Sequence, residues 1–120
     1  MTDHRFPNWR RIRKQSEFDR VYSSSVYSAD DVLVIRGCRN GLDRARLGLA
    51  VSRKVGSAVV RNRWKRLVRE IFRTRRCRIP IGYDFVVRPR RGAHPVFQAV
   101  ARSLPELSQQ VARRLEKQGK

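Results

Sequence analysis

The chain has 120 residues, which suits one folded domain, and 40% of its residues are hydrophobic. No run approaches the roughly 20 apolar residues of a membrane-spanning helix, and no apolar signal-peptide segment opens the chain, so we expect a cytoplasmic protein without a membrane partner. The chain carries 29 Lys and Arg against 10 Asp and Glu, a formal net charge of +19, and this density of positive charge indicates a nucleic-acid partner.

The N-terminal residues 1–13 are predicted to form a basic flexible arm, followed by a folded core over residues 14–117. Phe6 and Trp9 lie among the basic residues of the arm. Two interpretations stay open: a disordered tail whose aromatic rings pack loosely on the domain, or an arm that contacts phosphates and stacks on a base. No linker or internal repeat divides the chain, so residues 1–120 are predicted to form a single nucleic-acid-binding domain.

A short first helix is predicted to begin at Ser16, with Asp19 completing a capping box three residues later. Phe18, Val21 and Tyr22 follow helical spacing, and the run of three serines after them ends the helix. An apolar stripe of this kind usually packs into a core. Because Phe18 and Tyr22 lie one turn apart, the two rings could instead edge a groove and stack on bases.

Three strands are predicted next, at residues 26–27, 32–36 and 46–52. An Asn-Gly pair at residues 40–41 is a turn signal, so the strand at 46–52 is expected to pair with the strand at 32–36. Its large side chains alternate with small ones, and the large face should meet a helix. The small face leaves room for another helix or for a strand of nucleic acid, and consists of Gly48, Ala50 and Ser52.

A basic helix is predicted from Ala58 to about Arg75, with Ser57 as its N-cap. Its apolar stripe, which needs a sheet to cover it, contains Val60, Trp64, Leu67, Val68 and Ile71. Its opposite face carries Asn62, Lys65, Arg66, Arg69 and Arg73, with Arg61 and Arg63 at the two borders. Charges of one sign on a helix face repel one another by tenths of a kcal/mol per close pair. This repulsion favours the interpretation that the face binds a polyanion over the interpretation that it is only solvated.

The last strand is predicted at residues 83–88. Pro105 interrupts the helical pattern that follows, and a proline inside a helix costs about 3 kcal/mol. We therefore expect a separate helical turn at 95–102 and a final helix from Leu104 to Lys117, with Ser103 as its N-cap and Pro105 in its first turn.

The chain shows no catalytic centre or metal site of its own. Its ten acidic residues are scattered, whereas two-metal phosphoryl transfer needs carboxylates that converge on ions about 3.5–4 Å apart. Cys38 and Cys77 form no metal-ligand spacing with His4 or His94. No nucleotide-binding or hydrolase motif is present, so we expect a nucleic-acid binder without a small-molecule substrate.

The segment around Arg61, Asn62 and Arg63 closely resembles the signature of the bacterial ribonuclease P protein subunit. It is preceded by Lys-Val-Gly-Ser-Ala-Val-Val at 54–60 and followed by Lys-Arg-Leu-Val-Arg-Glu at 65–70. The segments at 13–22, 47–52 and 84–87 resemble the first helix and two strands of that family, in the same order.

This resemblance implies an α+β fold, an α-β-β-β-α-β-α sandwich with a mostly antiparallel sheet and a left-handed crossover through the basic helix. It implies a ribonucleoprotein endonuclease whose catalytic RNA binds magnesium and removes the 5′ leader of precursor tRNA, with that RNA and precursor tRNA as partners. The residues expected to contact RNA are Arg53, Lys54, Arg61, Asn62, Arg63, Lys65, Arg66, Arg69 and Arg73. The residues expected to line a groove for the leader are Phe18, Tyr22, Gly48, Ala50 and Ser52.

Two features depart from the family pattern: Trp64 replaces a smaller aliphatic residue, and residues 93–102 resemble an insertion. Two other functions are compatible with the charge, a ribosomal or assembly RNA-binding protein and a DNA-compacting protein. The first does not account for the extended signature. The second would normally show a dimer seam, which the sequence lacks.

Overall fold

The structure is a computed structural model that describes residues 10–118, and its element order confirms the α+β arrangement α-β-β-β-α-β-α. The helices and strands are α1 (Gln15–Ser23), β1 (Tyr27–Ala29), β2 (Leu33–Arg39), β3 (Arg46–Leu49), α2 (Ala58–Thr74), β4 (Tyr83–Pro89) and α3 (Phe97–Gln118). Two short 3₁₀ turns, η2 (Arg53–Val55) and η3 (Arg76–Arg78), flank α2.

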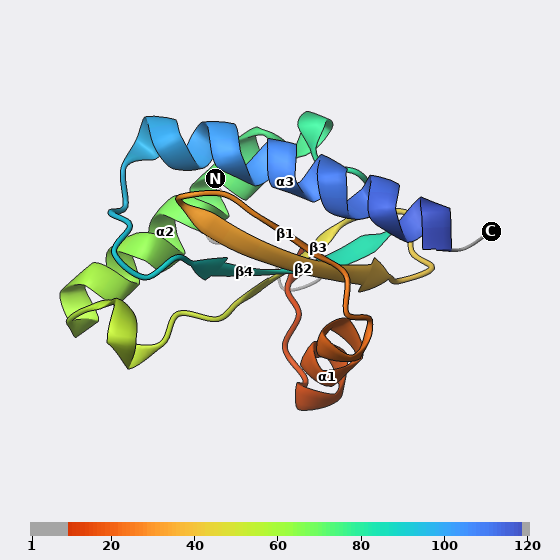
Figure 1. Ribbon diagram of the computed structural model, residues 1–120, viewed down its shortest axis with the longest axis horizontal. Helices are drawn as coiled ribbons and strands as arrows, with labels where there is room; N and C mark the ends of the chain where they lie inside the picture. Colours follow the sequence, from red (N-terminus) through yellow and green to blue (C-terminus); the bar gives the residue numbers. More distant parts are fainter. Residues whose placement is uncertain (1–9, 119–120) are drawn as a thin grey trace, which may run out of the picture.

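The four strands form one mixed sheet in the order β1-β2-β4-β3 (Figure 1). Both β1–β2 and β2–β4 are antiparallel, whereas β3 and β4 are parallel. The expected pairing of residues 46–52 with residues 32–36 is therefore wrong, because β4 lies between these strands. Six of the seven residues of β4 are buried, and the central position gives this strand a hydrogen-bonding neighbour on each side.

The helices cover the two faces of the sheet unequally. Figure 1 shows α3 along one face and the smaller α1 on the other. The main core lies between the sheet and α2 with α3, and its largest fully buried side chains include Trp64, Phe72 and Phe85. At Gly37 in β2, an added Cβ would lie 2.6 Å from Cγ1 of Val111, so the absence of a side chain permits α3 to approach the sheet closely.

Helix α3 is continuous from Phe97 to Gln118, and Pro105 lies inside it. The predicted break into two helices is therefore wrong. Ser103 does not cap a helix; its hydroxyl donates to Oδ2 of Asp30 at 2.6 Å. Val100, Leu104 and Val111 on either side of the proline are fully buried. Burying each such side chain contributes about 1.5–3 kcal/mol, and together they offset the cost of the proline.

Helix α1 begins earlier than predicted, because Glu17 rather than Asp19 caps it. Oε1 of Glu17 accepts hydrogen bonds from the backbone N–H groups of Arg13 and Lys14, both at 3.0 Å. Ser16 lies within the first turn, and Asp19 accepts a hydrogen bond from Gln15 instead. A carboxylate can satisfy two free N–H groups at a helix N-terminus, where the helix dipole also favours it.

The folded core also begins before residue 14. The N–H of Ile12 donates to the carbonyl of Leu47 at 2.9 Å, Arg11 forms a parallel bridge to the same residue, and Ile12 is 5% exposed. Residues 10–13 thus lie against the core, and their predicted place in the flexible arm is wrong. Residues 1–9 of that predicted arm, with Phe6 and Trp9, lie outside the described residues.

Candidate nucleic-acid interface

Helix α2 divides into an apolar and a basic face as predicted. Trp64, Val68, Ile71 and Phe72 are fully buried in the main core, and Oγ of Ser57 accepts the N–H of Val60 at the predicted N-cap. The opposite face is exposed at Asn62, Arg63, Arg66 and Arg73 and partly exposed at Arg61, Lys65 and Arg69. Of the other predicted apolar residues, Val60 and Leu67 are only partly buried against the core, whereas Phe72, which was not predicted, is fully buried.

One acidic residue lies on this helix, and it is already paired. Glu70 binds the guanidinium of Arg73 at 2.7 Å, so Arg73 is the partly neutralised member of the predicted RNA-binding set. Arg53 and Lys54 are exposed in η2, directly before the helix. Gly56 separates η2 from α2 with φ of 154°, a backbone angle that other residues adopt with strain.

The face of the sheet opposite α2 and α3 carries α1, and Phe18 packs directly on β3. A Cβ added at Gly48 would lie 2.8 Å from Cε1 of Phe18 and 3.3 Å from Cβ of Ile12. The space expected over Gly48 is therefore filled by these side chains. Phe18 and Ala50 also pack against a small cluster that contains Val21 and Ile12. Phe18 thus anchors α1 to the sheet with one side of its ring.

Beyond Phe18 the sheet face carries a small depression of about 10 Å³, which we call the sheet groove. It is lined by Tyr22, Val34, Arg36, Val86 and Arg88. The guanidinium of Arg36 lies over two rings, 5.7 Å from the centroid of Tyr22 and 5.4 Å from that of Tyr27. These rings are 43% and 50% exposed, so the groove combines exposed aromatic surface with positive charge.

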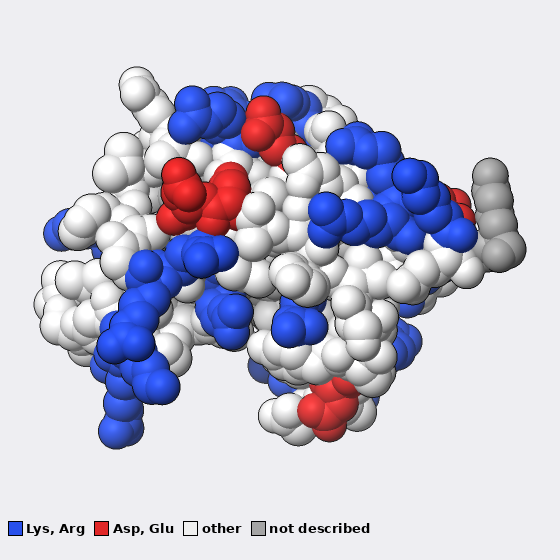
Figure 2. Space-filling view, viewed as in Figure 1, with Lys and Arg blue, Asp and Glu red and all other residues white. Residues whose placement is uncertain are grey.

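The sheet groove continues past the end of β4. A larger hollow of about 330 Å³ shares Val34 and Arg88 with it and also includes Ser52, Lys54, Arg90 and Arg91. Tyr22 and Ser52, two predicted leader-groove residues, therefore line one continuous surface, whereas Gly48 and Ala50 lie under or beside α1. Figure 2 shows basic side chains gathered at this end of the molecule.

A second hollow, of about 280 Å³, joins α1 to the basic face of α2. Its lining consists of Arg11, Ile12, Arg13, Phe18, Leu47, Leu49, Lys65 and Arg69. Burial lowers the pKa of Arg69, and the nearby positive charge of Arg11 lowers it further. Close cations of this kind repel one another unless an anion lies between them, so the hollow is suited to a phosphate group.

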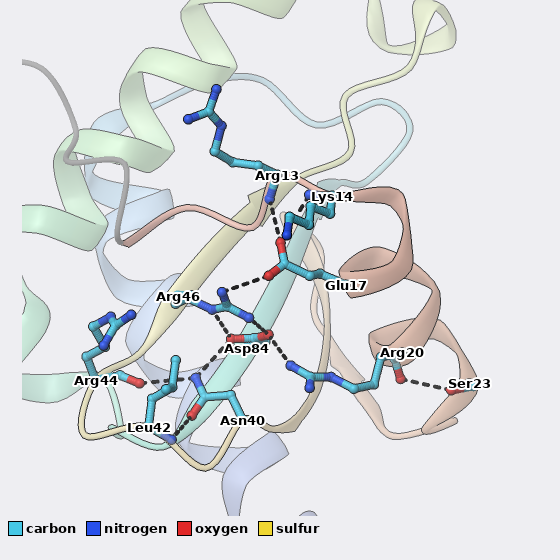
Figure 3. A network of polar contacts seen from close by, with 10 residues as sticks. All are labelled: Arg13, Lys14, Glu17, Arg20, Ser23, Asn40, Leu42, Arg44, Arg46 and Asp84. Atoms are coloured by element: carbon cyan, nitrogen blue, oxygen red, sulfur yellow. Dashed lines mark hydrogen bonds and ion pairs between the residues drawn. The ribbon is translucent and has the colours of Figure 1, made fainter.

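A buried carboxylate fixes the position of α1, as Figure 3 shows. Asp84 in β4 is fully buried. Its Oδ1 accepts from Nε of Arg46 at 2.8 Å and from Nδ2 of Asn40 at 2.9 Å; its Oδ2 accepts from Nη2 of Arg46 at 2.7 Å and from Arg20 at 2.9 Å. Burial by itself would raise the pKa of Asp84, but these hydrogen bonds, led by Arg46, hold the pKa below its ordinary value.

The same network reaches α1 at two points. Arg20 comes from the middle of that helix, and Nη1 of Arg46 binds Oε2 of Glu17 at 2.9 Å near its start. The pKa of Glu17 falls to about 2, chiefly because its carboxylate accepts the backbone N–H of Lys14. We call Glu17, Arg20, Asn40, Arg46 and Asp84 the Asp84 network. It sets where the rings of α1 lie relative to the sheet.

Sequence reasoning missed the Asp84 network and Arg36, and it placed Arg88, Arg90 and Arg91 at the end of the last strand without assigning them to the site. Arg36 and Arg88 are basic residues within otherwise apolar strands, which was a usable signal. Their proximity depends on the β2–β4 register, in which Arg36 pairs with Val86 and Val34 with Arg88. That pairing was not predicted, so the two arginines could not be assigned to one surface.

Within residues 10–118, no group of three or more His, Cys, Asp or Glu side chains is arranged to hold a metal ion. Among the carboxylates, Asp84 holds its network, and Oδ1 of Asp30 accepts the N–H groups of Val32 and Leu33 at 2.8 and 3.0 Å. No helix in this part of the chain is both long and apolar enough to span a membrane.

The fold and these surfaces define an α+β nucleic-acid-binding protein, with a basic helix on one side of the sheet and an aromatic, arginine-lined groove on the other. The family profile described as Ribonuclease P matches residues 6–114. The chain therefore belongs to the ribonuclease P protein family. It is a component of a ribonucleoprotein endoribonuclease of tRNA processing.

Individual relatives agree with this assignment. The ribonuclease P protein component of Thermotoga maritima is 39% identical over 95 residues, covering 79% of this chain and 81% of the relative. That of Desulfovibrio desulfuricans is 41% identical over 122 aligned residues, covering 96% and 92%.

Two solved structures share the fold. The RNase P protein from Thermotoga maritima matches with a TM-score of 0.74 at 34% identity, over 82% of this chain and 96% of that chain. The Staphylococcus aureus RNase P protein matches with a TM-score of 0.73 at 33% identity, over 83% and 93%.

Proposed function

We propose that this protein holds the catalytic RNA of ribonuclease P through the basic face of α2 and holds the 5′ leader of precursor tRNA in the sheet groove. The observation that carries the proposal is the hollow shared by α1 and α2, in which Phe18 lies together with Lys65 and Arg69. This hollow places side chains of α1 and of the basic face of α2 on one cation-lined surface.

The groove suits a single strand of RNA. The exposed ring of Tyr22 offers a stacking surface, and base stacking on an aromatic ring contributes about 1–3 kcal/mol. Arg36 and Arg88 supply charge for the phosphates on either side. None of these contacts reads a base edge by a fixed donor pattern, so the leader is held with little dependence on its sequence.

The chemistry belongs to the RNA. Family membership implies a magnesium-dependent catalytic RNA, and a hard cation of this kind requires oxygen ligands in near-octahedral arrangement. Within residues 10–118 the carboxylates are not grouped to supply such ligands, and the buried Asp84 is surrounded by arginine and asparagine donors. The magnesium ions are accordingly assigned to the RNA, and the protein positions substrate and neutralises charge.

Two finer features follow from the family resemblance. The β3–α2–β4 connection is proposed to be a left-handed crossover, against the usual right-handed preference. The protein is proposed to act in the bacterial cytoplasm, where precursor tRNA is processed. A ribosomal or assembly role has no specific observation in its favour.

Reconstitution tests the proposal. The protein, freed of RNA, is mixed with a bacterial ribonuclease P RNA and precursor tRNA at a magnesium concentration that barely supports cleavage by the RNA. Adding the protein should increase the rate of leader removal, and the protein without the RNA should cleave nothing. No stimulation at any protein concentration, or cleavage by the RNA-free protein, would overturn it.

A further inference from the structure

The C-terminal half of α3 carries a basic surface that the proposed function leaves unused. Gln110, Arg113, Arg114 and Lys117 lie three, four and seven residues apart and line one hollow of about 240 Å³. This spacing places all four on one face of the helix. We call this surface the α3 stripe. Figure 2 shows Lys and Arg side chains gathered over this end of α3.

The stripe offers hydrogen-bond donors and lacks a carboxylate in its lining. Oε1 of Gln110 accepts the hydroxyl of Ser28, which leaves the amide N–H groups as its remaining polar function. Nη1 of Arg114 donates to the backbone carbonyl of Tyr27. This guanidinium is therefore held in place by a neutral group, and its positive charge is retained. Arg113 and Lys117 are exposed beside it.

The acidic residues of the same helix lie outside the hollow. Glu116 binds Arg39 at 3.2 Å and accepts the hydroxyl of Tyr83, which directs it to the other side of α3. Glu106 lies one turn before Gln110 and bounds the stripe at that end. A hollow lined by three cations and an amide, with no acceptor among its charged groups, matches the oxygens of a phosphate.

The stripe is separate from both proposed RNA surfaces. Gln110 and Arg114 contact β1, which forms one edge of the sheet. Helix α2 packs near β3 at the opposite edge. Helix α1, which contributes Tyr22 to the sheet groove, lies on the opposite face of the sheet from α3 (Figure 1). The α3 stripe shares no lining residue with the sheet groove or with the hollow beside the basic face of α2.

We infer that the α3 stripe binds the phosphodiester backbone of a second RNA segment, so that the protein bridges two RNA segments across the width of its sheet. The inference rests on the proposed RNA-binding role of the chain. The ligand chemistry is a run of phosphates, contacted by cations and amide donors without base recognition. The segment belongs either to the catalytic RNA or to the body of the tRNA.

The test replaces the two exposed cations of the stripe, in the double variant Arg113→Gln with Lys117→Gln. The matched control, Arg78→Gln with Arg102→Gln, removes the same charge from exposed residues outside the stripe. Salt dependence is measured for binding of the protein to catalytic RNA, and for binding of the holoenzyme to precursor and mature tRNA. Melting temperatures confirm that both proteins fold.

The salt slope is the slope of the logarithm of the binding constant against the logarithm of the salt concentration. The stripe variant should lower the magnitude of this slope by roughly 0.7–0.9 for each phosphate that is no longer neutralised, and the control should leave it unchanged. A change with catalytic RNA assigns the segment to that RNA, and an equal change with both tRNAs assigns it to the tRNA body. An unchanged slope in every arm, or an equal change in the control, overturns the inference. Arg66→Gln, on the basic face of α2, is measured in parallel. If this variant alters the slope and the stripe variant does not, the further inference fails while the α2 interface stands.

Discussion

Phe18 and Tyr22 lie one turn apart on α1, yet their rings have different surroundings. Phe18 packs against Gly48 and Ile12, whereas Tyr22 is 43% exposed and contacts Arg36. Phe18 therefore contributes chiefly to the folded state, whereas the exposed part of the Tyr22 ring is available to a ligand. The two functions were not separable from helical spacing, which gives both residues the same face.

We expect Tyr22→Ala to weaken binding of leader-bearing precursor tRNA by about 1–3 kcal/mol, the contribution of one stacked base. The melting temperature should change less than in Phe18→Ala, because 43% of the surface of Tyr22 is exposed. Affinity of the holoenzyme for both precursor and mature tRNA is the measurement. Phe18→Ala is the comparison, and should lower the melting temperature as well, with a cost below the roughly 3–5 kcal/mol of a fully buried Phe. Equal reductions for precursor and mature tRNA in Tyr22→Ala would contradict the groove assignment.

Glu17 gives the protein a defined acid sensitivity. Its pKa is about 2 in the folded protein against 4.5 for an ordinary Glu. Because the folded pKa is the lower one, the carboxylate stabilises the fold above pH 4.5, and this contribution is lost as the pH falls toward 2. The free energy of unfolding, measured with denaturant between these pH values, should decline less with falling pH in Glu17→Gln than in the unsubstituted protein. Parallel declines would show that Glu17 does not contribute to acid sensitivity.

At the scale of elements, α1 is held to the sheet by the Asp84 network and by Phe18. Replacing Asp84 itself would leave the mostly buried Arg46 with Glu17 as its one remaining partner in the network, and breaking a buried pair in this way costs about 3–5 kcal/mol. A variant of Arg20 is more informative. Asp84 then keeps Arg46 and Asn40, and α1 loses one of its two links to the network.

Arg20→Met should therefore change the melting temperature little, since half of the Arg20 side chain is exposed. It should weaken leader binding, because Tyr22 is then less well positioned over the groove. Binding to catalytic RNA should be unaffected. Arg20→Lys retains a donor to Asp84 and should restore part of the leader affinity. If Arg20→Met affects catalytic RNA and leader equally, the network has no specific positioning function.

The basic face of α2 can be tested with a pair of arginines on one helix. Arg66→Ala should weaken binding to catalytic RNA and lower its salt slope by roughly 0.7–0.9. Arg73→Ala should have a smaller effect, because Glu70 already pairs with Arg73. Both residues are exposed, so neither change should alter the fold. Identical salt slopes for the two variants and the unsubstituted protein would mean that this face is merely solvated.

The resemblance predicted the family and the element order correctly, and the other features predicted correctly from sequence are local ones. The two faces of α2 and its cap at Ser57 follow from residue spacing within one helix. The position of β4 between β2 and β3 depends on distant segments, and the turn signal at residues 40–41 predicted a hairpin instead. The Asp84 network joins α1, β3 and β4, so no short pattern could reveal it. Pro105 misled the prediction because the buried apolar face of α3 outweighs a local penalty.

For the molecule as a whole, the charge of +19 is distributed over surfaces on different sides of one small sheet. The proposed division gives catalytic RNA to α2, the leader to the sheet groove, and a further phosphate backbone to the α3 stripe. Such a protein accelerates a reaction by holding RNA segments together and neutralising their repulsion. Its own side chains need not take part in bond cleavage.

The most direct test compares how the protein changes the affinity of catalytic RNA for precursor and for mature tRNA. Binding constants are measured for the RNA alone and for the holoenzyme, with tRNAs that carry a long leader, a short leader or none. The protein should increase the affinity for the long-leader precursor much more than the affinity for mature tRNA. The increase for the short-leader precursor should lie between these two. An equal increase for all three tRNAs would contradict the account, because the sheet groove would then make no contact with the leader.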